Sequence, residues 1–218
     1  MQKFNSQLLR AYFICGSQDV PAGKTLPGLV EEALKAGITA YQFRDKGPRS
    51  TLAAAARLPL ARQLHGLCQQ YHVPFFVDDD VDLAQAIGAE GIHVGQSDEA
   101  IKQVVAAVHE QMMVGYSCST LAEIIQGDHI GGIDYYGSGP IFATQSKDDA
   151  DPEIGLSGLT QLVEQTNRPI VAIGGITVES LPAIAQTGAA GASVISMIAS
   201  STNIKQTVQA MLAAPWNN

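Results

Sequence analysis

Cysteine is scarce in this sequence, with only three among 218 residues. Cys15, Cys68 and Cys118 are far apart and lack metal-ligand spacing, which argues against a disulfide framework and a cysteine-based zinc site. Long apolar runs are also missing, since no stretch approaches the roughly 20 residues of a membrane span. The N-terminal segment has no apolar core followed by a small-residue cleavage site. We therefore expect a cytoplasmic protein with no membrane partner.

Positive charge is in deficit as well. The 13 lysines and arginines are outnumbered by 21 aspartates and glutamates, which gives a formal net charge of −8. This balance argues against general affinity for nucleic acid, so no nucleic-acid partner is expected. Any anionic ligand must be held by a local group of cations.

Short apolar segments alternate with amphipathic ones along the whole chain. The apolar segments are residues 11–16, 38–46, 74–79, 91–95, 112–118, 134–139, 169–175 and 191–196. Strands that alternate with helices favour a parallel sheet, and a chain of this length closes most economically as one (β/α)₈ TIM barrel over residues 1–218. An open doubly wound sheet is the alternative, but no G-x-G-x-x-G follows the first predicted strand.

Polar and charged side chains gather where the predicted strands end. In "QFRDK", Gln42, Arg44 and Lys46 stand on alternate positions and therefore point to the same side of the strand. Long loops are often functional, and the polar stretch 139–155 after the sixth strand has the character of a mobile lid. In a barrel all these strand ends meet at one mouth. The other residues placed there are Asp78, Asp79, Asp98, Ser117 and Lys147.

Two glycine-containing segments predict a phosphate site. "AIGGIT" ends the seventh strand with Gly174 and Gly175, and "VISMIASS" ends the eighth with Ile195 and Ser196. Loops after these two strands, with a helix N-terminus, are a common phosphate site of such barrels. The alternative is that the glycines only make a tight turn.

A second cationic group, formed by Arg44, Lys46 and Lys147, lies beside the carboxylates of Asp79 and Asp98. Two carboxylates repel a polyphosphate unless a metal intervenes, and Mg²⁺ is typically held by one or two carboxylates plus phosphate oxygens. Mg²⁺ is therefore the expected cofactor. The alternative is that these acids only favour the start of a helix. His93 is predicted to be a hydrogen-bonded packing residue rather than a catalytic one.

The ordered set of motifs resembles that of the thiamin-phosphate synthase family over nearly the whole chain. "QFRDK" matches the family's Gln-x-Arg-x-Lys strand, and "GIHVGQSD", "GSGPIFATQSK", "AIGGIT" and "VIS" follow in the family's order. The resemblance implies an enzyme of thiamin biosynthesis with two phosphorylated small-molecule substrates. It implies a transferase that joins hydroxymethylpyrimidine diphosphate to a thiazole phosphate, or to its carboxylated form, and releases pyrophosphate.

The resemblance also implies a role for each matching position. Asp79 and Asp98 would hold Mg²⁺, while Arg44, Lys46, Ser117 and Lys147 would act in catalysis. Pyrimidine diphosphate would be bound by Gln42, Arg44, Lys46, Asp78, Ser117 and Lys147. Thiazole phosphate would be bound by Thr144, Gln145, Ser146, Gly175, Ile195 and Ser196.

Some positions depart from the family pattern. Asp78 replaces the usual Asn and either faces the ligand or caps the next helix, and Ser119 stands where a His is common. Two alternative functions remain: a thiazole tautomerase, which is an isomerase that uses that His, and a non-catalytic phosphate-binding barrel. The complete cationic strand and Ser119 favour the synthase. The sequence leaves the oligomeric state open.

Overall fold

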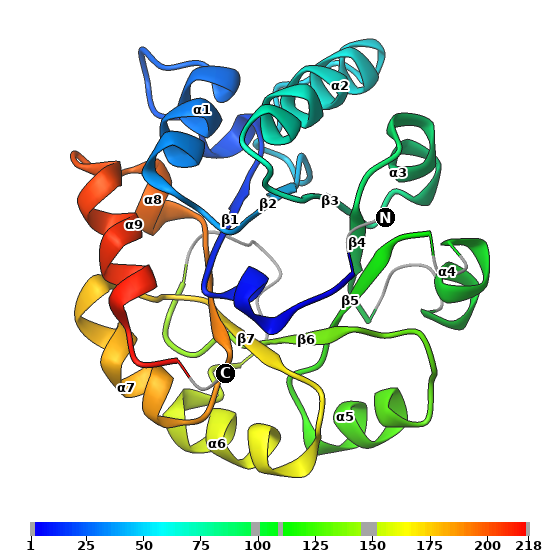
Figure 1. Cartoon of the computed structure of the whole chain (residues 1–218), viewed down its shortest axis with the longest axis vertical. Helices are drawn as coiled ribbons and strands as arrows, with labels where there is room; N and C mark the ends of the chain where they lie inside the picture. Colours follow the sequence, from blue (N-terminus) through cyan, green and yellow to red (C-terminus); the bar gives the residue numbers. More distant parts are fainter. Residues whose placement is uncertain (1–2, 97–100, 109–110, 145–151, 217–218) are drawn as a thin grey trace.

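Eight parallel strands close into a barrel in the computed structural model, which describes residues 3–96, 101–108, 111–144 and 152–216 (Figure 1). Each strand pairs with the next along the chain, and β1 also pairs with β8. The (β/α)₈ prediction is confirmed, and the open-sheet alternative is wrong. The strands are β1 (Ala11–Cys15), β2 (Ala40–Phe43), β3 (Phe75–Asp78), β4 (Gly91–Val94), β5 (Met113–Ser117), β6 (Tyr135–Ser138), β7 (Ile170–Ile173) and β8 (Gly191–Val194).

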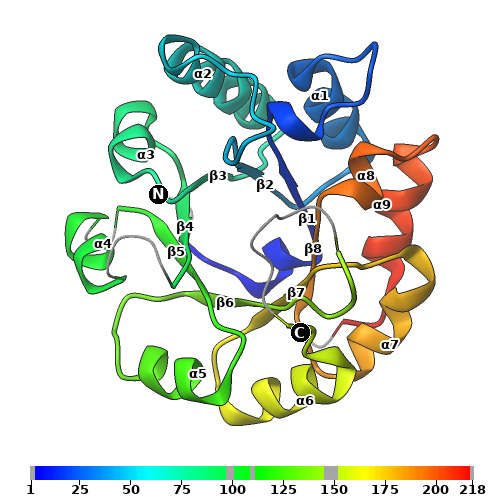
Figure 2. The same ribbon diagram turned by 180° about the vertical axis from the view of Figure 1, so that it is seen from behind.

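Helices form a ring around the strands, as both views of the ribbon show (Figures 1 and 2). None of the helices in the described part of the chain is long and apolar enough to cross a membrane. The helices are α1 (Leu26–Ala36), α2 (Ala54–Gln70), α3 (Val81–Ile87), α4 (Ile101–Val108), α5 (Leu121–Asp128), α6 (Gly155–Gln165), α7 (Leu181–Gln186), α8 (Ser196–Ala199) and α9 (Ile204–Ala213). Three short 3-10 helices are η1 (Ser6–Leu9), η2 (Ser17–Asp19) and η3 (Val178–Ser180).

β1 is buried on both faces because it separates two hydrophobic cores. Along β1, Phe13 belongs to the core between strands and helices, whereas Tyr12 and Ile14 belong to the core inside the barrel. This division follows from the two-residue period of a strand. It explains why β1 reads as an uninterrupted apolar run rather than as an alternating one.

The amino end of the barrel is covered by the N-terminal segment. In Figure 1, η1 lies across the centre of the ring. Leu9 is fully buried, and Phe4 stacks on Tyr135 with 5.7 Å between the ring centroids. Gly191 allows this close approach, since a Cβ atom there would overlap the Leu9 carbonyl. The carboxyl end is left for a site.

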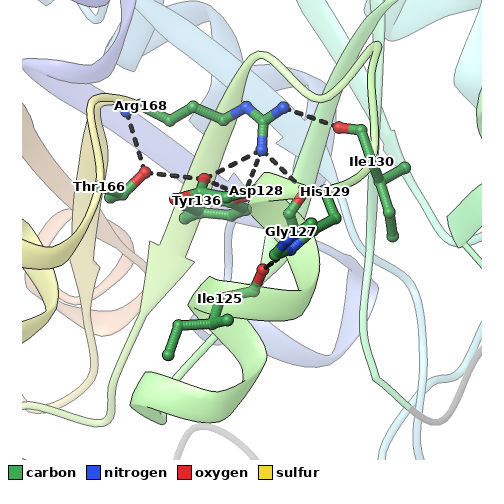
Figure 3. Close-up of polar contacts among 8 residues, drawn as sticks. All are labelled: Ile125, Gly127, Asp128, His129, Ile130, Tyr136, Thr166 and Arg168. Carbon is green, nitrogen blue, oxygen red and sulfur yellow. Dashed lines mark hydrogen bonds and ion pairs between the residues drawn. The ribbon is translucent and has the colours of Figure 1, made fainter.

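Arg168 ties α5 to the start of β7 (Figure 3). Its Nη1 donates to the Gly127 carbonyl at 2.8 Å and to Asp128 Oδ1 at 3.1 Å, and its Nη2 donates to the Ile130 carbonyl at 2.7 Å. The same guanidinium donates to the Tyr136 hydroxyl. Carbonyls at a helix C-terminus lack partners within the helix, so one planar side chain satisfies groups that would otherwise need water.

We expect Arg168→Ala to lower the free energy of unfolding by about 2 kcal/mol, because several charge-assisted hydrogen bonds are lost together. Arg168→Lys should recover less than half of this, since an ammonium cannot reproduce the planar fork. Urea unfolding of the three proteins measures the difference. Equal stability of the Ala variant and the wild type would contradict a stabilising role for these contacts.

Glu90 joins α2 to the beginning of β3. Its Oε2 accepts a hydrogen bond from the Phe75 N–H at 2.9 Å, and its Oε1 lies 3.0 Å from Nε2 of His65. Burial alone would raise the pKa of Glu90, but these hydrogen bonds outweigh burial and hold the pKa below its usual value. The ionised form is therefore favoured by folding.

Glu90→Gln should lower the free energy of unfolding by about 1 kcal/mol at neutral pH. A carboxylate whose folded pKa is lowered stabilises the protein above its unfolded pKa of about 4.3 and loses that contribution as pH falls through the folded value. The difference between wild type and variant should thus shrink below about pH 4. Urea unfolding across a pH series tests this. A difference that stays constant down to pH 3 would contradict the assignment.

Candidate active site

A cavity of about 290 Å³ opens at the carboxyl ends of the strands. Because β2 to β8 each contribute a strand end or the loop after it, side chains distant in sequence meet there. The predicted site residues that line it are Gln42, Arg44, Lys46, Asp78, Asp79, Ser117, Thr144, Gly175, Ile195 and Ser196. The remaining ones, Asp98, Gln145, Ser146 and Lys147, lie outside the described residues, as does the centre of the predicted lid.

The cations after β2 face the carboxylates after β3. Nε of Arg44 lies 3.5 Å from Oδ2 of Asp78, and Nζ of Lys46 lies 2.6 Å from Oδ2 of Asp79. Arg44 is only 8% exposed. A charge in such a place needs compensation, and the neighbouring strand provides it. The cations that follow β2 therefore belong to a polar mouth rather than to the hydrophobic core.

Asp45, between the two cations, has a separate role that the sequence did not reveal. Its side chain is buried and accepts hydrogen bonds from the Ser17 N–H at 2.8 Å and from the Ser50 hydroxyl. Gln18 of the same loop donates to the Arg44 carbonyl at 2.6 Å. These contacts join the loop after β1 to the segment that carries Arg44 and Lys46, and so fix its course.

The three consecutive acids after β3 have three different environments. Asp80 caps α3, because its Oδ1 accepts from the Leu83 N–H at 2.9 Å. Asp78 faces Arg44, so the alternative that Asp78 caps this helix is wrong. Asp79 has a left-handed backbone with φ of +61° and donates its N–H to the His93 carbonyl at 2.9 Å. Such a conformation is uncommon for a residue other than glycine and is often found at functional sites.

The opposite side of the cavity is built from backbone. Gly174 and Gly175 have φ of +96° and +63°, and a Cβ atom on Gly175 would lie 2.5 Å from the Ala143 carbonyl oxygen. The positive φ values agree with a tight turn, and both glycines also line the cavity. Ser196 begins α8, the short extra helix after β8, whose first N–H groups have no acceptor within the helix.

Several lining residues were assigned other roles, or none, from the sequence. Ser119 donates its hydroxyl to the Gly139 carbonyl at 2.6 Å, and Glu123 forms the capping box with Thr120. Gln96 was not singled out, yet its Nε2 donates to the Ser117 carbonyl at 2.7 Å. His93 makes two side-chain hydrogen bonds, as expected of a packing residue, but it also borders the cavity.

The described residues hold no activated cysteine nucleophile and no metal cluster. Cys15, Cys68 and Cys118 are buried free thiols, and burial raises the pKa of each of them, which favours the thiol over the reactive thiolate. Within the described ranges, no group of three or more His, Cys, Asp or Glu side chains is placed to hold a metal ion. The cavity is lined by carboxylates and cations from the segments after β2 and β3 and by glycines from the segment after β7.

Comparison with known proteins assigns the chain to a family. A family model described as thiamine monophosphate synthase matches residues 11–198. The chain is 58% identical to a thiamine-phosphate synthase of Lactiplantibacillus plantarum and 55% identical to one of Levilactobacillus brevis, over 97% of each chain in both cases. The solved structure of a thiamine phosphate pyrophosphorylase from Pyrococcus furiosus superposes with a TM-score of 0.80 at 27% identity, covering 95% of this chain and 96% of that one. This chain belongs to the thiamine monophosphate synthase family.

Proposed function

We propose that this enzyme joins hydroxymethylpyrimidine diphosphate to a thiazole phosphate, or to its carboxylated form, to give thiamin phosphate and pyrophosphate. The observation that carries the proposal is that one cavity is lined both by cationic side chains from the segment after β2 and by glycines from the segment after β7. Arg44 and Lys46 stand at one end, while Gly175 and the start of α8 stand at the other. Two phosphorylated substrates need two such ends. We place the reaction in the cytoplasm, where free thiols such as these are kept reduced.

The pyrimidine diphosphate is assigned to the cationic end. Arg44 and Lys46 would donate charge-assisted hydrogen bonds to diphosphate oxygens, and Lys147 would add a third cation. Gln42 and Ser117 supply neutral polar groups from the same part of the cavity. Asp78 would hold Arg44 in place, although its charge opposes the ligand.

Mg²⁺ is assigned to Asp79, together with Asp98. The Asp79 carboxylate borders the cavity and already attracts a cation, the ammonium of Lys46 at 2.6 Å. Carboxylate oxygens are the protein ligands that Mg²⁺ prefers, and one or two of them suffice when phosphate oxygens complete the shell. The residues present therefore fit the metal, which would offset the repulsion between these acids and the diphosphate.

Thiazole phosphate is assigned to the backbone end, with Thr144, Gln145, Ser146, Gly175, Ile195 and Ser196 as its binding residues. Gly175 and Ser196 line the cavity, and the first N–H groups of α8 would favour an anion. Catalysis then consists of aligning the two substrates and neutralising the charge that develops on the leaving pyrophosphate. The side chains proposed to neutralise the charge on the leaving pyrophosphate are those of Arg44, Lys46, Ser117 and Lys147.

The relatives are synthases, so they support neither a thiazole tautomerase nor a non-catalytic phosphate-binding barrel. The isomerase would need an acid–base group where Ser119 stands, and the Ser119 hydroxyl is engaged with the Gly139 backbone. A non-catalytic barrel would need only one anion site.

Incubation of the purified protein with both substrates and Mg²⁺ tests the function. Chromatography should show thiamin phosphate and pyrophosphate in equal amounts. Omission of either substrate should abolish both products. Conversion of thiazole carboxylate phosphate to an isomer, without a pyrimidine substrate, would favour the tautomerase instead.

A further inference from the structure

A chain of hydrogen bonds crosses the inside of the barrel, and four of its five residues, Tyr12, Gln42, His93 and Ser117, line the cavity. Nε2 of Gln42 lies 3.0 Å from the Tyr12 hydroxyl, which lies 3.0 Å from the Tyr135 hydroxyl. The Tyr135 hydroxyl lies 3.1 Å from Nδ1 of His93, and Nε2 of His93 lies 3.0 Å from Oγ of Ser117. The two ends of this chain are proposed substrate contacts. The three residues between them have no role in the proposed function so far.

The Gln42 end of the chain suggests its direction. An amide nitrogen only donates, so the Tyr12 hydroxyl accepts from Gln42, and its own proton is available for Tyr135. In this direction Tyr135 donates to Nδ1 of His93, whereas in the opposite direction the Nδ1–H group would donate to Tyr135, and the NMR experiment below distinguishes the two. Because Nδ1 accepts, the neutral ring carries its proton on Nε2, and this N–H donates to Ser117.

The surroundings keep both phenols protonated and in place. Tyr12 and Tyr135 are almost completely buried, and burial raises the pKa of each above its usual value. Glycines on the neighbouring strands make room for the contact with His93. A Cβ atom on Gly115 would overlap both Tyr135 and the imidazole, and one on Gly137 would lie 3.0 Å from Cε1 of His93. Tyr135 and His93 therefore pack against each other in space that glycine at positions 115 and 137 leaves open.

The direction of the chain determines which hydrogen bond the Ser117 hydroxyl can donate. Among the described residues, its Oγ has no hydrogen-bond partner other than His93. Since Oγ accepts from His93, its own proton is left to be donated into the cavity. We propose that His93 and Tyr135 are positioning residues that make Ser117 a hydrogen-bond donor to the leaving diphosphate, an inference that rests on the proposed function.

Such a donor should act mainly on turnover. Negative charge builds on the leaving pyrophosphate during the reaction. A correctly oriented hydrogen-bond donor therefore stabilises the transition state more than it stabilises the bound substrate. Tyr135→Phe removes the hydroxyl that fixes the tautomer while it keeps the ring. We expect this variant to lower kcat about tenfold and to change KM for the pyrimidine diphosphate less than about threefold.

Tyr136→Phe is the matched control, because it deletes the same group from the next residue of β6. The Tyr136 hydroxyl belongs to the Arg168 contacts outside the barrel, so this variant should lose stability but keep kcat. His93→Gln should retain more activity than His93→Leu, since an amide still offers one donor and one acceptor.

A double-mutant cycle separates positioning from a general structural effect. In a Ser117→Ala background, Tyr135→Phe should produce no further loss of kcat, because its influence passes through the missing hydroxyl. The same tenfold loss in both backgrounds, or no loss in either, would overturn the proposal.

Nitrogen NMR of histidine-labelled protein gives a readout that does not depend on catalysis. His93→Gln identifies the His93 signals among the five histidines of the chain. These signals should report a proton on Nε2 in the wild type, with a shift at Nδ1 in Tyr135→Phe. A proton on Nδ1 in the wild type would refute the direction of the chain. If the tautomer is as expected but no thiamin phosphate forms, the proposed function fails and the role of Ser117 toward diphosphate fails with it, while the direction of the hydrogen-bond chain stands.

Discussion

Asp79→Asn should raise the Mg²⁺ concentration that gives half-maximal rate at least about a hundredfold, since a direct carboxylate ligand is lost. Asparagine is the informative replacement because it tolerates the left-handed backbone that Asp79 adopts at φ of +61°. Alanine would add backbone strain of about 1 kcal/mol and so confuse loss of the ligand with loss of stability. Initial rates over a Mg²⁺ series, after removal of bound metal with a chelator, measure the change.

Asp82→Asn is the matched control for this prediction. Asp82 is an exposed residue in the first turn of α3, three positions further along the chain, so the same charge is removed away from the cavity. The control should have the metal dependence of the wild type. If Asp79→Asn also keeps that dependence, Asp79 is not a ligand, and full turnover in excess chelator would remove the metal from the proposal.

Arg44→Ala should lower kcat/KM for the pyrimidine diphosphate about a hundredfold. The guanidinium lies beneath the mouth of the cavity with little exposure, where charge-assisted hydrogen bonds to phosphate are worth up to about 3 kcal/mol. Calorimetry should show weaker binding of the diphosphate, with less than about a threefold change in affinity for thiazole phosphate. Equal weakening of both ligands would mean that the two ends of the cavity are not separate anion sites.

The control for Arg44→Ala must remove one positive charge elsewhere. Lys35 serves this purpose, because it forms an exposed ion pair with Glu31 on α1 at 2.6 Å and does not line the cavity. Surface pairs of this kind contribute little to stability, so Lys35→Ala should leave both affinities unchanged. A similar loss in both variants would point to net charge rather than to a specific contact.

The barrel and much of its mouth could be predicted because both follow from local patterns. The predicted strand over residues 38–46 is shorter in the structure, because β2 ends at Phe43, so Gln42 lies on the strand while Arg44 and Lys46 follow it. All three still line the cavity, since parallel strands bring their carboxyl ends together. Asp79 and Ser117 were placed at the mouth by the same rule, and both line the cavity.

What could not be predicted depends on partners far apart in sequence. The role of Asp45 is defined by the Ser17 backbone, and nothing in "QFRDK" distinguishes it from an ordinary surface acid. Asp78 and Asp80 are chemically identical neighbours, and only the path of the chain decides that Asp80 caps the helix. The contact between Tyr12 and Tyr135 spans 123 positions, so neither tyrosine differs in sequence from a residue of the apolar core.

The stacking of Phe4 on Tyr135 has a consequence for hydration of the barrel interior. Phe4 precedes η1, the element that lies across the amino end of the barrel, and its ring lies parallel to that of Tyr135 within 9°. Water admitted there would compete for the phenol proton, and a proton that can point either way no longer fixes the tautomer of His93. Residues 3–10 do not line the cavity, yet we expect them to limit the access of water to Tyr135, so the orientation of the His93 ring proton would depend on a segment outside the active site.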